Sequence, residues 1–227
     1  MTIRLDSVRV RLGDVDVLTD VSIDLDARTV AVIGENGSGK STFARLLGGM
    51  VTHASGGVSI LGLDPRKQAV ELRRRIAMVF SNPDAQIIMP TVAEDVAFSL
   101  RADRLSRAER GERVSAALTR FGLAELAERS SHDLSGGQKQ LLALCGAFVR
   151  APDLVIADEP TAYLDARNAR LVADHLFRDT GHRLVLVTHD LALAARCDVA
   201  VLFARGRVAA VGDPRGIIAE YEAILGC

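Results

Sequence analysis

The stretch Gly34-Glu35-Asn36-Gly37-Ser38-Gly39-Lys40-Ser41 decides how this chain folds. It matches the phosphate-binding pattern G-x-x-x-x-G-K-[ST] at every fixed position. The apolar run from Thr29 to Ile33 before it is typical of a buried parallel strand, and residues 42–47 after it have helical composition. Strand, glycine loop and helix are the context that the pattern requires. The sequence therefore predicts a nucleotide site here.

Each part of this loop has a chemical task. Its glycines permit a tight turn and let backbone N–H groups point inward, while the start of the helix presents its positive end to an anion. Lys40 is expected on the β- and γ-phosphates, and the Ser41 hydroxyl on Mg²⁺. The residues expected to bind the nucleotide are Gly34, Glu35, Asn36, Gly37, Ser38, Gly39, Lys40, Ser41 and Thr42.

Composition limits the class of protein. With 227 residues, 48% of them apolar and 25% charged, the chain can bury a core as one large domain or two small ones. Lys and Arg number 28 against 29 Asp and Glu, and no basic block is present. We therefore expect a folded protein without a nucleic-acid-binding face.

The cysteines and apolar runs indicate the compartment. The chain has three cysteines, Cys145, Cys197 and Cys227. An odd number without C-x-x-C spacing indicates neither a disulfide framework nor a zinc site. The longest apolar run, 141–149, is far short of the ~20 residues that span a bilayer, and the first residues do not begin a signal peptide. These features predict a soluble chain in a reducing compartment that can dock on a membrane protein.

Hydrophobic periodicity predicts the other elements. A hairpin with one wet face is expected at 3–10 and 15–25, a turn at Ser55-Gly56-Gly57, and a strand covered on both sides at 76–80. Further strands are expected at 58–61, 154–157, 184–187 and, as a pair, within 198–211; helices are expected at 68–75, 93–101, 106–121, 138–149 and 214–225. The run of helices between about 91 and 150, with no strand between them, indicates a helical insertion into an α/β sheet. The strands at 154–157 and 184–187 have helical patterns beside them, which is typical of parallel βαβ units.

A second chemical element is the run Leu154 to Ala157 that leads into Asp158 and Glu159. A buried parallel strand would deliver both carboxylates to its C-terminal edge, where such sheets bind ligands. Asp158 would reach Mg²⁺, directly or through water, and Glu159 would face an attacking water as general base. Paired acids at a strand end are common, so this pair alone is a weak signal for a metal site. Together with the phosphate loop it becomes a strong one.

A third element is Leu134-Ser135-Gly136-Gly137-Gln138. A serine followed three residues later by glutamine, directly before an apolar helix, is a capping box. The two intervening glycines indicate more than a cap, because a helix N-terminus whose bare backbone approaches a phosphate needs them.

Together these motifs resemble the nucleotide-binding subunits of ATP-binding cassette (ABC) transporters, over essentially the whole chain. Ser135 to Gln138 resembles the family's signature motif, Asp158-Glu159 its Walker B end, Leu164-Asp165 its D-loop and His189 its switch histidine. The resemblance implies a P-loop NTPase fold of the α/β class: an ABC-type ATPase core with an antiparallel β subdomain and an inserted helical subdomain. It also implies a single domain, 1–227, with the helical subdomain at about 85–150.

The resemblance implies ATP hydrolysis with Mg²⁺ by a head-to-tail dimer, formed with a second copy or with a related subunit. Each ATP would lie between the phosphate loop of one subunit and Ser135, Gly136, Gly137 and Gln138 of the other. Glu159, His189 and Lys40 would be the catalytic residues, and Ser41 and Asp158 the metal ligands. Glu159 would polarise the water, His189 would contact the γ-phosphate, and Lys40 would stabilise charge.

Residues 79–98 are similar to the Q-loop region and following helix of energy-coupling factor (ECF) transporter ATPases. That similarity implies an importer of a vitamin such as biotin, or of cobalt or nickel, and a chain held peripherally on the inner face of the cell membrane. Its partners would be a transmembrane coupling protein and a substrate-binding membrane subunit. Asp84, Glu94 and Asp95 are expected either to meet arginines of the coupling protein or merely to favour a helix N-terminus.

Two residues depart from the family pattern. Ser81 stands where the Q-loop glutamine is usual, which weakens the expected link between metal, water and membrane partner. Leu12 stands near the place of the aromatic residue that stacks on adenine. Two alternative functions remain: a soluble ABC ATPase without a transporter, and the ATPase subunit of a conventional ABC transporter.

Overall fold

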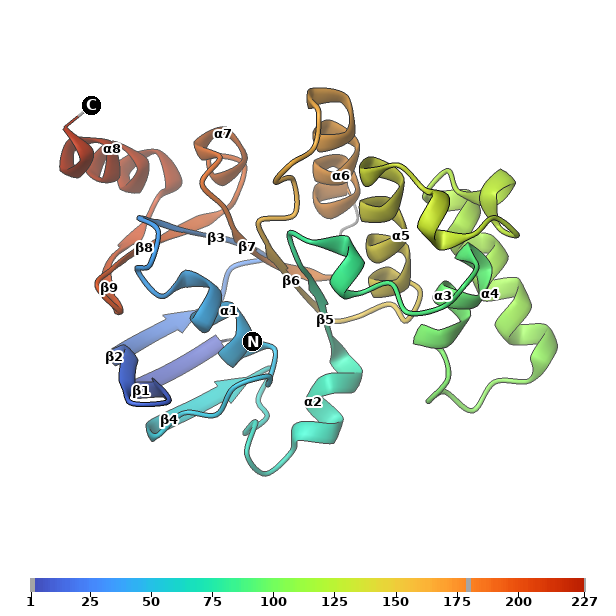
Figure 1. Cartoon of the computed structure of the whole chain (residues 1–227). Coiled ribbons are helices and arrows are strands. Elements are labelled where there is room, and N and C mark those ends of the chain that lie inside the picture. Colours follow the sequence, from blue (N-terminus) through green and yellow to red (C-terminus); the bar gives the residue numbers. More distant parts are fainter. Residues whose placement is uncertain (1–2, 179–180, 227) are drawn as a thin grey trace. The chain divides into compact units, whose positions relative to one another are not determined.

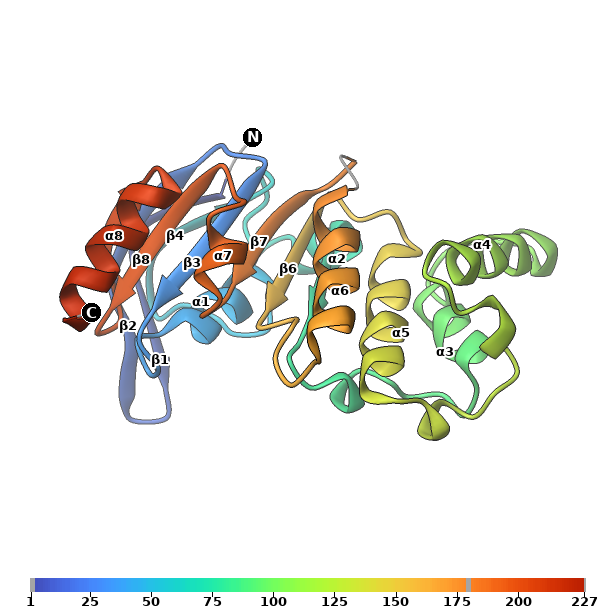
Figure 2. The same ribbon diagram turned by 90° about the horizontal axis from the view of Figure 1, so that it is seen from above.

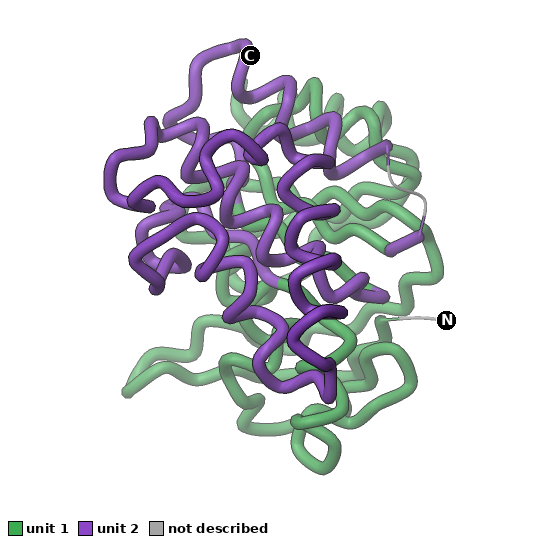
Figure 3. The backbone as a smooth tube through the Cα atoms, turned by 90° about the vertical axis from the view of Figure 1, so that its right-hand side faces the viewer, with its two compact units in different colours: residues 1–77, 154–158, 183–227 green, residues 78–153, 159–182 purple. Residues whose placement is uncertain are grey.

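The chain forms two compact units in the computed structural model, which describes residues 3–178 and 181–226 (Figures 1 and 3). Unit 1 comprises Met1–Ala77, Leu154–Asp158 and Arg183–Cys227, and unit 2 comprises Met78–Asp153 and Glu159–His182. The organisation as one domain with a helical insertion at about 85–150 stays a prediction.

Unit 1 contains a three-stranded antiparallel sheet with the order β2-β1-β4. Its strands are β1 (Ile3–Leu12), β2 (Val15–Leu25) and β4 (Ser55–Ile60). Buried and exposed side chains largely alternate along β1 and β2, so the expected hairpin with one wet face is confirmed.

The expected turn at residues 55–57 is wrong, because these residues begin β4 and pair with β1. Gly56 lies where the pairing register shifts and has a φ of 90°. A Cβ at this position would lie 2.5 Å from the Asp6 carbonyl oxygen. The glycine therefore marks a close approach of two backbones within a sheet, not a reversal of the chain.

The larger sheet has six strands in the order β5-β6-β7-β3-β8-β9. They are β3 (Thr29–Gly34), β5 (Ile76–Val79), β6 (Leu154–Asp158), β7 (Arg183–Val187), β8 (Val199–Ala204) and β9 (Arg207–Gly212). The central pairs are parallel and β8–β9 is antiparallel. All residues of β3 and β6 are buried, as their apolar runs predict. The strand expected at 76–80 is confirmed. The expectation that both of its faces are covered is wrong, because β5 is an edge strand with two half-buried residues.

Helices cover both faces of the large sheet in unit 1 (Figures 1 and 2). Helix α1 (Lys40–Leu47) packs with the antiparallel sheet on one face, and α7 (Leu191–Ala194) and α8 (Pro214–Leu225) pack on the other. The rings of Phe43 and Phe203 are 4.9 Å apart and join α1 to β8. Helix α2 (Ala69–Arg75) precedes β5. The strands and helices of unit 1 thus bury a core on each side of the parallel strands.

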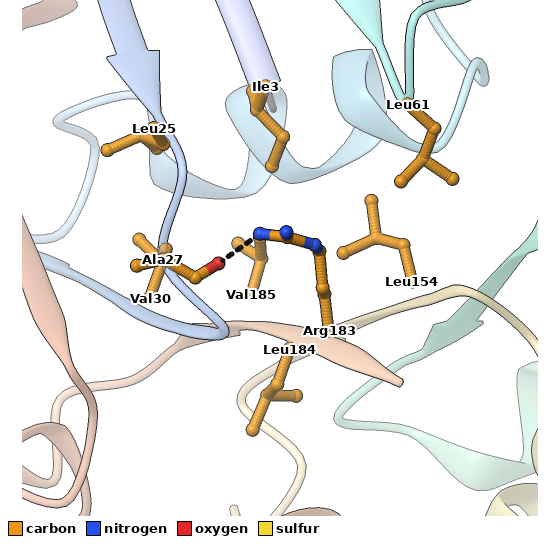
Figure 4. A pocket seen from close by; sticks show the side chains of 9 residues that line it. All are labelled: Ile3, Leu25, Ala27, Val30, Leu61, Leu154, Arg183, Leu184 and Val185. Atoms are coloured by element: carbon orange, nitrogen blue, oxygen red, sulfur yellow. Dashed lines mark hydrogen bonds between the residues drawn. The ribbon is translucent and has the colours of Figure 1, made fainter. Parts of the chain in front are cut away.

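A small cavity lies where the two sheets of unit 1 meet (Figure 4). Its volume of about 10 Å³ is enough for no more than one water molecule. Arg183 reaches into this apolar place, and its Nη1 donates a hydrogen bond of 2.8 Å to the Ala27 carbonyl oxygen. Its Nη2 lies 3.2 Å from an Asp26 carboxylate oxygen. Because both nitrogens have acceptors, the guanidinium ties the start of β7 to the loop before β3.

Unit 2 is mostly helical. It contains α3 (Val92–Ser99), α4 (Arg107–Arg120), α5 (Gly136–Phe148), α6 (Ala166–Arg178) and short 3₁₀ turns at 83–85, 124–126 and 131–133. Capping boxes begin α3, α4 and α5. The three helices expected at 93–101, 106–121 and 138–149 are confirmed with slightly shifted ends. Within residues 3–178 and 181–226, no helix has the length and apolar character needed to cross a bilayer.

Two glycine-to-alanine changes test this description of the fold. Gly56→Ala should lower the free energy of unfolding by at least about 1–3 kcal/mol, because the new methyl group meets backbone at a strained φ. Gly111→Ala, the matched control, lies within α4 with nothing within 4 Å of the added Cβ. It should raise the free energy by about 0.5–1 kcal/mol. Urea denaturation without nucleotide measures both, and a Gly56→Ala variant as stable as the wild type would contradict the close approach.

Candidate functional site

Three of the predicted site elements lie at one edge of the large sheet. Strands β6, β7 and β3 are neighbours and parallel, so their carboxyl ends meet at the same edge. The phosphate loop follows β3, Asp158 ends β6, and His189 comes two residues after β7. All of these residues belong to unit 1. The structure thus brings together the loop, one carboxylate and one histidine.

The phosphate loop bends tightly over the end of β8. Gly34 has a φ of 142°, and a Cβ there would lie 2.2 Å from the Phe203 carbonyl oxygen. The next turn is closed by a hydrogen bond of 3.2 Å from the Ser38 N–H to the Glu35 carbonyl. Only glycine fits position 34, because it alone combines this φ with so close an approach.

Lys40 and Ser38 supply polar groups that the loop encloses. The Lys40 side chain is buried, and its Nζ donates to the carbonyl oxygens of Gly34 at 2.7 Å and Glu35 at 2.8 Å. Ser38 Oγ is buried and has no hydrogen-bond partner in the structure. A buried hydroxyl without a partner is costly, so this group has unused capacity to bind a ligand oxygen.

Ser41 and Asp158 meet across the site. Ser41 Oγ donates a hydrogen bond of 3.1 Å to Asp158 Oδ1. Burial raises the pKa of the Asp158 carboxyl, while the bond from Ser41 and the charges of Arg45 and Lys40 act in the opposite direction. Hydroxyl and carboxylate oxygens are the hard ligands that Mg²⁺ prefers, so the pair fits the ion.

The metal site needs oxygen atoms from outside the protein. Among the described residues, no group of three or more His, Cys, Asp or Glu side chains could hold a metal ion. Mg²⁺ is commonly bound by one or two protein ligands together with substrate phosphates and water. The Ser41–Asp158 pair therefore fits a metal ion that arrives together with a nucleotide.

His189 lies on the exposed side of this edge. It follows Thr188, whose N–H donates to the Val32 carbonyl at 3.2 Å and whose side chain is fully buried. Asp190 then caps α7 by accepting from the N–H groups of Ala192 and Leu193. The backbone on both sides of His189 is thus fixed while its ring is exposed.

Glu159 begins the second segment of unit 2, Glu159–His182, and directly follows Asp158 in the sequence. Its φ is 52°, in the left-handed region that few residues other than glycine adopt. Such a conformation costs of the order of 1–3 kcal/mol and occurs often at functional sites. Tyr163, four residues on, has a φ of 63° and is almost fully exposed. The segment after β6 is therefore a strained turn that starts at the predicted general base.

The predicted signature segment lies in unit 2, at the start of α5. Ser135 is the N-cap: its Oγ accepts from the Gln138 N–H at 3.4 Å, and the Ser135 N–H donates to Gln138 Oε1 at 2.9 Å. The capping box is confirmed. A Cβ added to Gly136 would meet nothing within 4 Å, whereas one added to Gly137 would lie 2.4 Å from Asn168 Cγ. The surface at Gly136 is therefore open, whereas the space beside Gly137 is filled by the Asn168 side chain.

Two glutamines of unit 2 hold the backbone just before Ser81. Gln86 accepts from the Phe80 N–H at 2.8 Å and donates to the Met78 carbonyl at 2.9 Å. Gln140, which is buried in α5, donates to the Phe80 carbonyl at 3.1 Å. Because the Gln86 amide is used in this way, it does not replace the missing Q-loop glutamine. The sequence alone did not assign Gln140, although a polar residue in an apolar helix was a signal.

Next to Ser81 is a groove of about 430 Å³ that lies wholly in unit 2. It is lined by Ser81, Asn82, Pro83, Asp84, Gly136, Lys139, Gln140, Ala162, Tyr163 and Leu164. Asp84 is exposed and forms an ion pair of 2.7 Å with Lys139.

The expectation that Asp95 faces a partner is wrong. Its side chain is buried, and Oδ1 accepts from the N–H groups of Ile88 and Met89 at 2.8 and 3.0 Å. Glu94 completes the capping box with Thr91, as the helix-terminus interpretation predicts. Of these three acids, Asp84 alone lines the groove.

Comparison with known proteins gives concordant results. Residues 18–162 match the family described as ABC transporter. The biotin transport ATP-binding protein BioM of Rhizobium etli is 37% identical over 224 residues, which cover 99% of each chain. The energy-coupling factor transporter ATP-binding protein EcfA1 of Symbiobacterium thermophilum is 43% identical over 210 residues, 89% of this chain and 73% of that protein. The structure of cbiO1 from Clostridium perfringens, described as part of the ABC transporter complex cbiONQ, has a TM-score of 0.86 at 30% identity, covering 99% of this chain and 93% of that chain.

These findings confirm the expected fold class, a P-loop NTPase of ABC type. The matched residues include the phosphate loop, Ser135–Gln138 and Asp158–Glu159. Since the match covers more than half of the chain and the relatives align over most of it, the chain belongs to the ABC transporter family.

Proposed function

We propose that this chain is the ATP-hydrolysing subunit of an ECF-type importer. The observation that carries the proposal is the edge of the large sheet in unit 1, where Lys40 is buried in the phosphate loop and Ser41 bonds Asp158. An ammonium group, the backbone N–H groups of a glycine loop at a helix N-terminus and a hydroxyl–carboxylate pair are suited to a nucleoside triphosphate with its metal ion.

In the proposed reaction, water attacks the γ-phosphoryl group and ADP leaves. Glu159 accepts the proton of the attacking water, and His189 contacts the γ-phosphate and orients it. Lys40 leaves its two carbonyl acceptors for the β- and γ-phosphate oxygens, where its charge stabilises the transition state. Mg²⁺, held by Ser41 and Asp158, would supply further positive charge at the phosphates.

The proposed active state is a dimer of ATPase subunits. The open surface at Gly136 and the exposed Ser135 are suited to approach by the nucleotide of a second subunit. Residues Ser135, Gly136, Gly137 and Gln138 would then close over the ATP that the other phosphate loop holds. Each chain contributes half of two sites, and closing and opening of the dimer is the mechanical output.

The importer assignment is supported by the relatives. One is named for biotin transport, one for an energy-coupling factor transporter, and the structural relative is part of the complex cbiONQ. We assign this chain to uptake of a vitamin such as biotin, or of cobalt or nickel. It would lie peripherally on the inner face of the membrane, bound to a transmembrane coupling protein that works with a substrate-binding subunit.

Replacing Glu159 tests the catalytic assignment. Glu159→Gln should leave ATP binding intact and lower turnover by roughly 10²–10⁴-fold, because the general base is lost while shape is kept. Steady-state phosphate release and nucleotide binding by fluorescence measure the two effects. Asp158→Asn is the comparison: it should also weaken the Mg²⁺ dependence of binding. Near-normal hydrolysis by Glu159→Gln would remove this residue from the role.

Adding bulk at the signature segment tests the dimer. Gly136→Arg should abolish hydrolysis and ATP-dependent dimerisation but spare ATP binding, because its side chain extends into the open space that the second subunit would occupy. Ser135→Arg should act in the same way while also losing a cap worth about 1 kcal/mol. The matched control is Gly216→Arg in α8, where the added Cβ also meets nothing within 4 Å. Hydrolysis at the wild-type rate by Gly136→Arg would refute a dimer in which ATP lies between the two subunits.

Asp84 tests the proposed contact with the membrane partner. Asp84→Asn should weaken co-purification with the transmembrane coupling protein and slow uptake, because the groove loses a carboxylate that can pair with arginine. ATP hydrolysis by the isolated subunit should not change. Asp103→Asn is the matched control, since Asp103 is also an ion-paired acid of unit 2, with Arg150, but does not line the groove. Equal assembly of both variants would discard the docking role.

A further inference from the structure

The contact between Gly137 and Asn168 joins Ser135–Gln138, which meets the second subunit under the proposed function, to the start of α6. Gly137 is buried near the start of α5, and the Asn168 amide fills the space that a side chain at 137 would take. A Cβ there would lie 2.4–2.6 Å from Asn168 Cγ, Nδ2 and Oδ1. All of these atoms belong to unit 2.

Asn168 is held in this place by Asp165, the last residue of the D-loop pair Leu164-Asp165. Asn168 Nδ2 donates to Asp165 Oδ2 at 2.8 Å. The backbone N–H groups of Asn168 and Arg167 donate to Asp165 Oδ1 at 2.8 and 3.0 Å. These bonds lower the pKa of the Asp165 carboxyl, and the bond from the Asn168 backbone N–H has the largest effect. The Asn168 amide therefore cannot turn away from Gly137 without losing a hydrogen bond to a charged group.

The contact between Gly137 and Asn168 lies beside open space, so it limits how the start of α5 and the turn before α6 can move relative to each other. The groove of about 430 Å³ is lined by Gly136 and Gln140 of α5 and by Ala162, Tyr163 and Leu164 of the turn before α6. The two segments are thus separated by open space next to Gly136 and Leu164, and they touch at the neighbouring pair Gly137–Asn168. The Asn168 side chain is bonded to Asp165 and packs against the bare backbone at Gly137, so it can set how closely the two segments approach.

We propose that Asn168 is a positioning residue that fixes the signature segment, Ser135–Gln138, relative to Asp165. The proposal rests on the proposed function, in which Ser135–Gln138 close over the ATP bound by the other subunit; it adds that Asp165 reaches the same interface. With Asn168 in place, closure of Ser135 and Gly136 on the triphosphate moves Asp165 with them. Both segments then reach the interface together, and the transition state is assembled in one step.

Three variants test the role of the amide. Asn168→Ala removes the contact but keeps the backbone bonds to Asp165, and Asn168→Asp keeps the volume but sets a second carboxylate against Asp165. Both should lower kcat roughly ten- to hundred-fold, as misplacement of catalytic groups does, with KM for ATP little changed. Arg170→Ala, an exposed change on the same helix, is the control and should hydrolyse ATP like the wild type.

A compensating pair separates this role from the alternative that Gly137 must be bare for the phosphate. Gly137→Ala alone should lose activity, because its methyl group meets the Asn168 amide. The double variant Gly137→Ala/Asn168→Ala frees that space, and it should fold better and hydrolyse ATP faster than Gly137→Ala. No recovery in the double variant, or wild-type kcat in both Asn168 variants, would overturn the proposal.

Failure of the proposed function gives a different pattern. In that case the wild-type chain itself would lack ATP hydrolysis and ATP-dependent dimerisation, so these are measured first. Thermal unfolding of each variant, with and without ATP, accompanies the kinetics. A variant that loses kcat but keeps its ATP-induced stabilisation supports positioning of the interface over a loss of fold.

Discussion

The bend of the backbone between β3 and α1 is the constraint on which the rest of the structure depends. At Gly34 the chain passes so close to the Phe203 carbonyl that no side chain fits. The loop leads into α1 at Lys40, and Phe43 of this helix is buried. The parallel strands beside β3 then carry Asp158 and His189 to the same edge. The site follows from one turn and a strand order.

Buried charge explains why this edge requires a ligand. Lys40 and Asp158 are only 7% exposed, although a charged group loses much hydration energy on burial. The ammonium group is compensated by two carbonyl oxygens, and the carboxylate by one hydroxyl, which leaves its pKa raised. A triphosphate with a divalent cation would bring negative charge to Lys40 and positive charge to Asp158. Both groups would gain from binding, so their charges are preorganised for this ligand.

Short-range signals in the sequence predicted most elements, and the errors arise where distant segments meet. The phosphate loop, the capping box at Ser135 and the buried strands were predictable because each depends on residues close in the sequence. The start of β4 was missed because pairing with β1 overrides the turn preference of two glycines. The two alternatives for Asp95 could not be separated from the sequence, since only the fold shows that it binds the N–H groups of Ile88 and Met89. The contact of Asn168 with Gly137 has no sequence signal, because α5 and α6 meet only in three dimensions.

If two chains complete each ATP site, two inactive variants with defects in different halves of the site should complement each other. Lys40→Ala lacks a working phosphate loop, and Gly136→Arg lacks a working signature segment. ATP hydrolysis is measured for each variant alone and for an equimolar mixture. The account predicts almost no activity for either alone and clear recovery in the mixture, where the loop of one subunit meets the intact signature segment of the other. A mixture as inactive as its components, or full activity of Gly136→Arg alone, would contradict it.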